Sequence, residues 1–269
     1  LKFRKCSNQI DLKLIMEIIK FNNPKIIIFD CFDTLVSNSI EEWKNAFKLI
    51  CIKFKLPISP EKFWETWKNH ELLFRETRIR KFETKDPLLN EFITKKPFKT
   101  YAQAWKECLK ISVSKLNIKI NIEESLEILL NQHSKRTIFK ETKFVLEELK
   151  KEYKIFIISN ADDCFLYPCI QSLNIPQSDI FSSERSKLYK PDKRIFQNML
   201  SKVGIKPEEA WYVGDNYFDD VIGSYLADLN PIWINRNNLV KNHKYKIDNL
   251  IEIQNLTELI VILNNNSKK

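Results

Sequence analysis

Short apolar runs separated by long amphipathic stretches form the pattern of this 269-residue chain. Three runs rich in β-branched or aromatic residues, at 26–29, 155–158 and 211–213, each lead directly into polar or small residues. Runs of this length and composition are typical of buried strands in a parallel sheet. Two further runs, at 231–234 and 250–253, predict another strand and a short strand at the sheet edge.

Helical periodicity fills much of the sequence between these runs. It predicts a helix over 141–150 that returns to the sheet, a helix that begins after Lys190-Pro191-Asp192, and a terminal helix over 257–263. Residues 12–19 predict a short amphipathic helix ahead of the first strand. Strands that alternate with helices indicate an α/β fold with a doubly wound, Rossmann-like parallel sheet as its core.

The stretch between Val36 and Lys140 changes from buried strands to helical periodicity. Apolar residues cluster at helical spacing in three groups: Trp43, Phe47 and Ile50; Phe63, Trp64 and Trp67; and Ala104, Trp105, Cys108 and Leu109. The helix breakers Pro57, Pro60, Pro87 and Pro97 punctuate the stretch. We therefore predict a core domain of residues 1–36 and 140–269, with an α-helical cap inserted at 37–139. The aromatic residues are expected to form the core of this cap.

Side chains suited to phosphoryl chemistry lie at the ends of the three main strands. Asp30 follows the first strand, Ser159 follows the second and Asp215 lies at the end of the third. Ligands bind at the carboxyl ends of parallel strands, so these residues are expected in one site. An aspartate there can serve as a nucleophile or as a metal ligand. Lys190 and Asp220 add a positive charge and a further carboxylate.

The order Asp30, Ser159, Lys190 and Asp215/Asp220 resembles the four motifs of the haloacid dehalogenase (HAD) superfamily of hydrolases. The resemblance covers about residues 25–236, and residues 213–223 look like that family's Gly-Asp-x-x-x-x-Asp loop. Four motifs in register are far more specific than any one of them. The resemblance implies subfamily I, in which a helical cap lies between the first and second motifs.

The resemblance also implies catalytic roles for these residues. Asp30 would attack phosphorus and form an aspartyl-phosphate. Ser159 would hydrogen-bond the transferring phosphoryl group, and Lys190 would place a positive charge against it and keep Asp30 ionised. Thr34 and Asn160 are expected to contact the substrate together with Ser159 and Lys190. The substrate implied is a small phosphorylated metabolite.

Mg²⁺ is the cofactor that this resemblance implies. Its predicted ligands are Asp30, Asp215, Asp220 and the backbone carbonyl of Phe32. Mg²⁺ prefers oxygen ligands, and it would offset the repulsion between a dianionic substrate and the nucleophile. Asp219 is expected to be a neighbouring loop residue rather than a direct ligand.

The first motif departs from the family pattern of phosphatases, Asp-x-Asp-Gly-Thr. Phe32 stands where the second Asp, the general acid/base, is expected, and Asp33 stands on the Gly position. Phenylalanine cannot transfer a proton. Asp33 could substitute if the backbone bends to bring it round. Alternatively, Asp33-Thr34 could simply cap the helix expected near Ser39, and the two readings have about equal weight.

Two other functions stay open at this point. Dehalogenases of the family also carry a non-acidic residue at the position of Phe32, attack carbon and need no metal. They have largely lost the acidic pair that this chain keeps as Asp215 and Asp220, which favours the phosphatase. The third reading is a non-catalytic binding or regulatory module, with Phe32 marking lost chemistry.

Three arginines in the predicted cap, Arg75, Arg78 and Arg80, could meet an anionic substrate. Charge runs more often form a solvated helix face, and that is the expectation here. His70, His133 and His243 have no spacing typical of metal ligands and are expected to be surface or structural residues.

The net charge of +9 and the pI near 9.1 would attract nucleic acid or an acidic membrane. The chain is broadly rich in Lys, Asn and Ile, however, so neither nucleic acid nor membrane is expected as a partner. No apolar run is long enough to cross a bilayer, and the N-terminus lacks an apolar segment of the signal-peptide kind. Six cysteines without a CxxC pair predict reduced thiols and a cytoplasmic location. The oligomeric state stays open.

Overall fold

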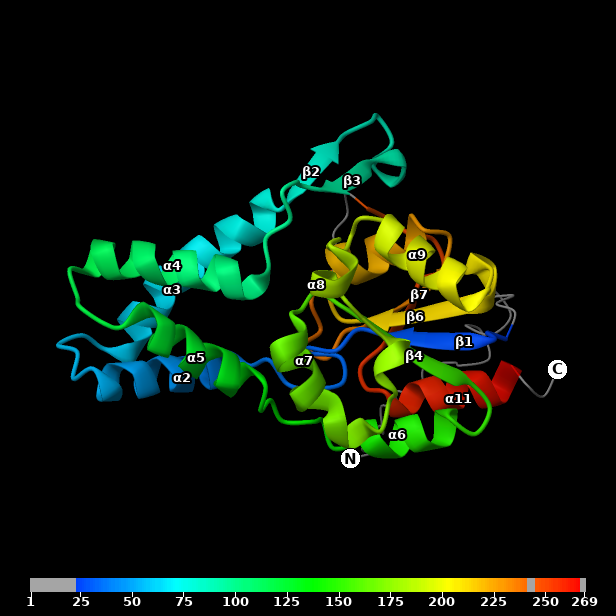
Figure 1. Cartoon of the computed structure of the whole chain (residues 1–269). Helices are drawn as coiled ribbons and strands as arrows, with labels where there is room; N and C mark the ends of the chain where they lie inside the picture. The colour runs from blue at the N-terminus through cyan, green and yellow to red at the C-terminus, as the bar shows by residue number, and fades with distance from the viewer. Residues whose placement is uncertain (1–22, 241–244, 267–269) are drawn as a thin grey trace, which may run out of the picture.

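The computed structural model describes residues 23–240 and 245–266. It has two parts: a parallel sheet covered by helices on both faces, and an inserted cap beside the carboxyl ends of the strands (Figure 1). The helix predicted at 12–19 and His243 lie outside the described residues. The predicted α/β fold with a Rossmann-like sheet and a helical insertion is confirmed.

The core sheet has six parallel strands in the order β5-β4-β1-β6-β7-β8. Their bounds are β1 Ile26–Phe29, β4 Lys154–Ser159, β5 Ile180–Ser182, β6 Ala210–Gly214, β7 Asn230–Ile234 and β8 Ile251–Ile253. The chain builds outward from β1 first through β4 and β5, and then on the other side through β6 to β8. This reversal of direction beside β1 is the place where doubly wound sheets bind their ligands.

Both faces of the sheet are buried, which explains why its strands read as uninterrupted apolar runs. In β1, Ile27 and Phe29 pack on one face, whereas Ile26 and Ile28 pack on the other. Helices α6 (Thr142–Leu149) and α11 (Thr257–Asn266) cover the first face, and α9 (Arg194–Val203) covers the second (Figure 1). These three helices match the predicted helices within a few residues.

Four helices form most of the insertion: α2 Ile40–Lys53, α3 Pro60–Thr77, α4 Tyr101–Leu116 and α5 Ile122–His133. Each begins at a side-chain cap that accepts from a backbone N–H of the first turn, supplied by Ser39, Ser59, Thr100 and Asn121. Trp43, Phe47, Phe63, Trp67 and Trp105 are buried between the helices. The prediction of an aromatic cap core is therefore confirmed.

An antiparallel hairpin in the insertion escaped prediction. Its strands are β2 Ile79–Phe82 and β3 Glu91–Thr94. Each strand has only four residues, and polar residues interrupt the apolar ones, so no apolar run marks them. The hairpin is held by tertiary contacts: Phe92 packs against Phe218 of the core, and Thr94 N–H donates to Asp192 at 2.7 Å. The three-residue strand β5 was missed for the same reason of length.

Two smaller expectations can be compared with the described residues. The helices in this part of the chain are all too short or too polar to cross a membrane. The five cysteines described there are free thiols: Cys31, Cys51, Cys108, Cys164 and Cys169.

Candidate active site

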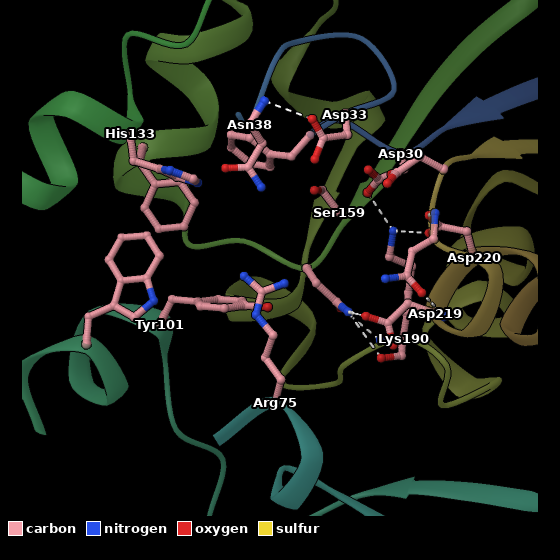
Figure 2. Close-up of a pocket in the computed structure, with 16 residues that line it drawn as sticks. Asp30, Asp33, Asn38, Arg75, Tyr101, His133, Ser159, Lys190, Asp219 and Asp220 are labelled. Carbon is pink, nitrogen blue, oxygen red and sulfur yellow. Dashed lines mark hydrogen bonds and ion pairs between the residues drawn. The ribbon is translucent and has the colours of Figure 1, made fainter. Parts of the chain in front are cut away.

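A cavity of about 130 Å³ lies between the cap and the carboxyl ends of the central strands. Both parts of the molecule line it. The core contributes Asp30, Phe32, Asp33, Ser159, Asn160, Phe165, Lys190, Asp215, Asn216, Asp219 and Asp220, and the insertion contributes Asn38, Arg75, Tyr101, Trp105 and His133. Figure 2 shows Asp30, Asp220 and Lys190 on one side of this cavity, with His133, Tyr101 and Arg75 on the other.

Asp30 follows β1 directly and is buried. Its backbone N–H donates to Val213 O of the neighbouring strand β6 at 2.9 Å, so sheet pairing continues to this residue. The carboxylate is therefore presented by the most rigid element of the fold, with one oxygen 2.6 Å from Lys190 Nζ.

Lys190 is the central cation of the site, although its side chain is only 2% exposed. Its ammonium group lies 2.6 Å from Asp30 Oδ1 and 2.6 Å from Asp220 Oδ1, and it also contacts Tyr212 Oη at 2.8 Å and Ile158 O at 3.1 Å. Burial opposes the charge, but Asp220 and Asp30 outweigh it and raise the pKa of Lys190. A lysine held by two carboxylates stays protonated.

Asp30, Asp215 and Asp220 form a carboxylate cluster in which one oxygen from each lies within 4.8 Å of the others. Burial, followed by the charges of Asp220 and Asp30, raises the pKa of Asp215 well above its usual value. Burial also raises the pKa of Asp220 to about 7, against the opposing effect of Lys190. One lysine does not neutralise three carboxylates. The three oxygen donors fit a hard divalent cation such as Mg²⁺.

Close packing against Gly214 positions Asp220. A Cβ added to Gly214 would lie 2.4 Å from Asp220 Cγ, which is closer than real carbon atoms approach. The backbone N–H of Asn216 donates to the second oxygen of Asp220 at 2.9 Å. The glycine of the Gly-Asp loop is therefore required by the approach of the later aspartate and not by an unusual φ angle.

Ser159 and Asn160 both line the cavity but differ in their contacts. Ser159 Oγ makes no hydrogen bond within the described part of the chain, so it is available to a ligand. The Asn160 amide is already engaged, because its oxygen accepts from Lys190 N at 2.8 Å and its nitrogen donates to Lys190 O and Asp219 Oδ2, each at 3.1 Å. The geometry supports Ser159 as a substrate contact and gives Asn160 a positioning role.

Thr34 does not line the cavity. It is fully buried, and its hydroxyl lies 3.4 Å from Asp215 Oδ1. This position does not support the predicted substrate contact. It fits a residue that helps to hold Asp215 within the carboxylate cluster.

The backbone bends at Asp33, which has a φ of +62°. Asp tolerates this left-handed conformation better than most residues, which explains how it replaces the family's glycine. One carboxylate oxygen accepts from Asn38 N–H at 2.9 Å, and Figure 2 shows the side chain beside the cavity near Asp30 and Ser159. Burial raises the pKa of Asp33. One oxygen holds the turn before α2, whereas the N-cap of that helix is Ser39 and not Asp33. The other oxygen faces no donor among the described residues, and the acid/base role of Asp33 stays a prediction.

Phe32 belongs to an aromatic lining. Its ring stacks on His133 with centroids 4.5 Å apart and packs at 5.9 Å against Phe165. His133 is buried, as expected of a structural histidine, and its ring also contacts Trp105. The carbonyl of Phe32 as a metal ligand stays a prediction.

The expectation that Arg75 and Arg78 form a solvated face is wrong. Arg75 lines the cavity, and its Nε donates to the buried Glu71. Arg78 is only 6% exposed and lies with one guanidinium nitrogen 2.7 Å from Asp219 Oδ2, which joins cap to core. Arg80 is exposed, as expected. Asp219 is a neighbour of the carboxylate cluster that binds Arg78 and Asn160, as predicted for a residue that is not a ligand.

The comparison with known families agrees with this geometry. A model described as haloacid dehalogenase-like hydrolase matches residues 24–224. The chain belongs to the haloacid dehalogenase-like hydrolases. Its helical cap between β1 and β4 is like that of subfamily I, so the family and subfamily predicted from the motifs are confirmed.

The relatives of this HAD hydrolase include proteins named as dehalogenases and proteins named as phosphatases. The (S)-2-haloacid dehalogenase 4A of Burkholderia cepacia is 28% identical over 111 residues, which are 40% of this chain and 48% of that protein. The glyceraldehyde 3-phosphate phosphatase of Methanothermobacter thermautotrophicus is 30% identical over 100 residues, 36% of this chain and 44% of that protein. These matches thus span a little under half the length of each relative.

Solved structures match over nearly the whole chain. The putative HAD-hydrolase YfnB of Bacillus subtilis, in a structure bound to magnesium, superimposes with a TM-score of 0.71 at 16% identity, covering 90% of this chain and 100% of that one. At this identity the likeness concerns the fold alone.

Proposed function

We propose that this HAD hydrolase is a Mg²⁺-dependent phosphatase that acts on a small phosphorylated metabolite. The observation that carries the proposal is the carboxylate cluster, in which Asp30, Asp215 and Asp220 converge on one point with Lys190 as their only cationic partner in the described chain. A phosphate dianion could not approach so much negative charge without a further cation. Mg²⁺, when bound, would supply that charge and polarise the phosphoryl group.

The residues of the chain then have separate tasks. Asp30 attacks phosphorus, forms the aspartyl-phosphate and releases the alcohol of the ester. Ser159 donates a hydrogen bond to the transferring group, and Lys190 keeps Asp30 ionised and ready to attack. Asp215 and Asp220 would hold the cation, together with Asp30 and the carbonyl of Phe32.

Asp33 takes the proton-transfer role that Phe32 cannot perform. It lines the same cavity as Asp30, its backbone bend brings it to that side, and burial raises its pKa, as suits a general acid. In the first step it donates a proton to the departing alcohol oxygen. In the second step it takes a proton from the water that attacks the aspartyl-phosphate, which releases inorganic phosphate and restores Asp30.

A dehalogenase is the second candidate, and two observations favour it. Phe32 is an aromatic residue at the position where that activity needs no acid, and haloacid dehalogenases are among the relatives. Asp30 would then attack carbon and displace a halide. The cluster of Asp215 and Asp220 would have no use in such a reaction, and for this reason we favour the phosphatase.

Hydrolysis of an activated aryl phosphate, with Mg²⁺ or with a chelator, tests the proposal. We expect turnover that requires Mg²⁺ and falls by at least about 10³-fold in Asp30→Asn. The affinity of the protein for Mg²⁺, measured by calorimetry, gives a second readout. This affinity should be lower in Asp215→Asn than in the native chain. Halide release from a 2-haloacid without metal would instead establish the dehalogenase. Folded protein that turns over neither substrate would point to a binding or regulatory module.

A further inference from the structure

The cap side of the cavity has hydrogen-bond donors whose partners are missing from the described residues. Arg75 is the first. Its Nε donates to Glu71, which is buried and also lies 2.8 Å from Lys68, so the guanidinium is fixed from behind. Its two terminal nitrogens have no acceptor in the described chain, and Figure 2 shows them directed into the cavity.

Asn38 presents an amide nitrogen to the same space. Trp43 Nε1 lies 2.9 Å from Asn38 Oδ1. An indole N–H can only donate, so the amide oxygen must face Trp43 and the NH₂ group must face away from it. That NH₂ group has no partner among the described residues, and Asn38 lines the cavity.

His133 and Trp105 add two N–H groups. Arg136 lies 3.2 Å from His133 Nδ1 and can only donate, so Nδ1 is the acceptor and a neutral ring carries its proton on Nε2. Burial and the charges of Arg136 and Arg75 lower the pKa of His133 well below its usual value, which keeps the ring neutral. Trp105 is 1% exposed, and its buried Nε1 has no hydrogen-bond partner in the described chain.

These four groups form what we call the donor wall: the terminal nitrogens of Arg75, Asn38 Nδ2, His133 Nε2 and Trp105 Nε1. Every member donates; His133 and Trp105 are buried, Asn38 is half-buried, and the side chain of Arg75 is 34% exposed. Arg75 adds a positive charge to the wall, and Trp105 Nε1 is a buried donor that costs free energy while it has no partner, so the wall indicates a ligand that supplies acceptors only. An alcohol or an amine would bring donors of its own, whereas a carboxylate accepts at both oxygens and matches the planar fork of arginine.

The size of the cavity limits the rest of the ligand. A cavity of about 150 Å³ holds a molecule the size of benzene, and this one is about 130 Å³. The carboxylate cluster and Ser159 occupy the opposite end, where a phosphoryl group belongs under the proposed function. This volume suits a short carbon chain between the two ends.

We propose that the substrate is a phosphorylated carboxylic acid of two or three carbons, whose carboxylate binds the donor wall while its phosphoryl group lies at Asp30. This inference rests on the proposed phosphatase function. It adds that the cap selects for a second negative charge at a fixed distance from the phosphoryl group.

The test compares two esters of equal length, a two-carbon phosphoester that ends in a carboxylate and one that ends in a hydroxyl. The native enzyme is expected to prefer the carboxylate ester by about 10- to 100-fold in kcat/KM. Arg75→Lys keeps a positive charge beside Glu71 but loses the planar fork. It should raise KM for the carboxylate ester by about 10-fold and change KM for the hydroxyl ester by a clearly smaller factor, so that the preference between the two esters falls. Arg80→Lys, on the exposed hairpin, is the matched control and should change neither.

Trp105→Phe provides a second, independent variant, because it keeps an aromatic ring and removes the N–H. It should also reduce the preference for the carboxylate ester, by a smaller factor than Arg75→Lys does. If Arg75→Lys does not fold, the result with Trp105→Phe decides the question. An equal rate for both esters in the native enzyme overturns the inference. So does a preference that both variants leave unchanged, or a stronger preference for an ester that ends in a second phosphate.

Failure of the phosphatase proposal is recognised separately. Turnover of the aryl phosphate with no preference between the two esters refutes the carboxylate and leaves the phosphatase standing. If no ester is hydrolysed, calorimetry with the two esters decides. Tighter binding of the carboxylate ester that Arg75→Lys abolishes supports the donor wall, and equal or absent binding refutes it.

Discussion

The two sides of the cavity have opposite chemistry. The core side offers acceptors, with five aspartates in the lining and Lys190 as its cation, whereas the cap side offers the donor wall. The core side is built from strand ends that sheet pairing fixes. The cap side is built from helices and a loop that pack through aromatic rings, and it joins the core through contacts such as the ion pair of Arg78 with Asp219 and the hydrogen bond from Thr94 N–H to Asp192.

This difference separates two tasks. The core side can perform a reaction with any phosphoryl group that reaches Asp30, and the cap side decides which molecules reach it. Variants on the core side should therefore change rates for all substrates or change stability, whereas variants on the cap side should change selectivity. Four predictions examine that division, from the largest expected effect to the smallest.

Asp33 lies where the two sides meet, and its variant should have the largest effect. Asp33→Asn keeps a residue that tolerates the left-handed backbone and an oxygen that can accept from Asn38 N–H. It cannot transfer a proton. We expect kcat to fall by about 10²- to 10⁴-fold for alkyl phosphates, which have poor leaving groups, and by much less for an activated aryl phosphate. A loss of equal size on both substrates would show that Asp33 serves only the turn.

Gly214→Ala should disrupt the core side by steric conflict with Asp220. The added methyl would displace that carboxylate, costing about 1–3 kcal/mol in the free energy of unfolding and weakening Mg²⁺ binding. Gly204→Ala is the control, because Gly204 has a φ of +69° but open space around it. It should cost about 1 kcal/mol without changing Mg²⁺ binding. Equal Mg²⁺ affinity in both variants would contradict the packing argument.

Asp215→Asn should affect stability in opposite directions with and without the cation. In metal-free protein it removes a carboxylate from a crowded cluster, so the free energy of unfolding should rise by about 1–2 kcal/mol. With Mg²⁺ the native chain should gain stability from binding, and the variant should gain little. Thermal unfolding of both proteins with and without Mg²⁺ measures this. A variant that is less stable in both conditions would indicate that the cluster does not bind the cation.

His133 on the cap side should make the free energy of unfolding depend on pH. The folded ring stays neutral, whereas the unfolded chain takes up a proton below a pKa of about 6.5. The unfolded state then binds more protons, so the free energy of unfolding should fall as the pH drops below 6.5, by up to about 1.4 kcal/mol per pH unit. His133→Asn keeps an acceptor for Arg136 and should flatten this slope between about pH 7.5 and about pH 5.5. An unchanged slope would assign it to other groups.

Much of the fold followed from local pattern. The runs before Asp30, Ser159 and Asp215 predicted three strands because a strand buried on both faces needs apolar residues throughout. The hairpin β2–β3 and the strand β5 were missed because their few residues gain order from neighbours such as Phe218, which are distant in the sequence.

The candidate site was predicted unevenly for the same reason. Lys190 was placed correctly by motif order, although most lysines are solvated. Thr34 was expected to contact the substrate, and its position does not support that contact, because the pattern could not show that its hydroxyl turns to Asp215. Arg75 was taken for a surface residue, since a charge on a helix reads the same whether it faces solvent or a cavity.

The sequence by itself determined the core side of this HAD hydrolase. Apolar runs define where strands end, and parallel pairing brings those ends to one edge, so Asp30, Ser159 and Asp215 had to meet. Only the tertiary structure decided the cap side. Whether Arg75 is a solvated charge or part of a binding site depends on the buried Glu71 behind it and on the free donors of Asn38 and Trp105 around it. Such burial is a property of long-range packing that residue spacing does not encode.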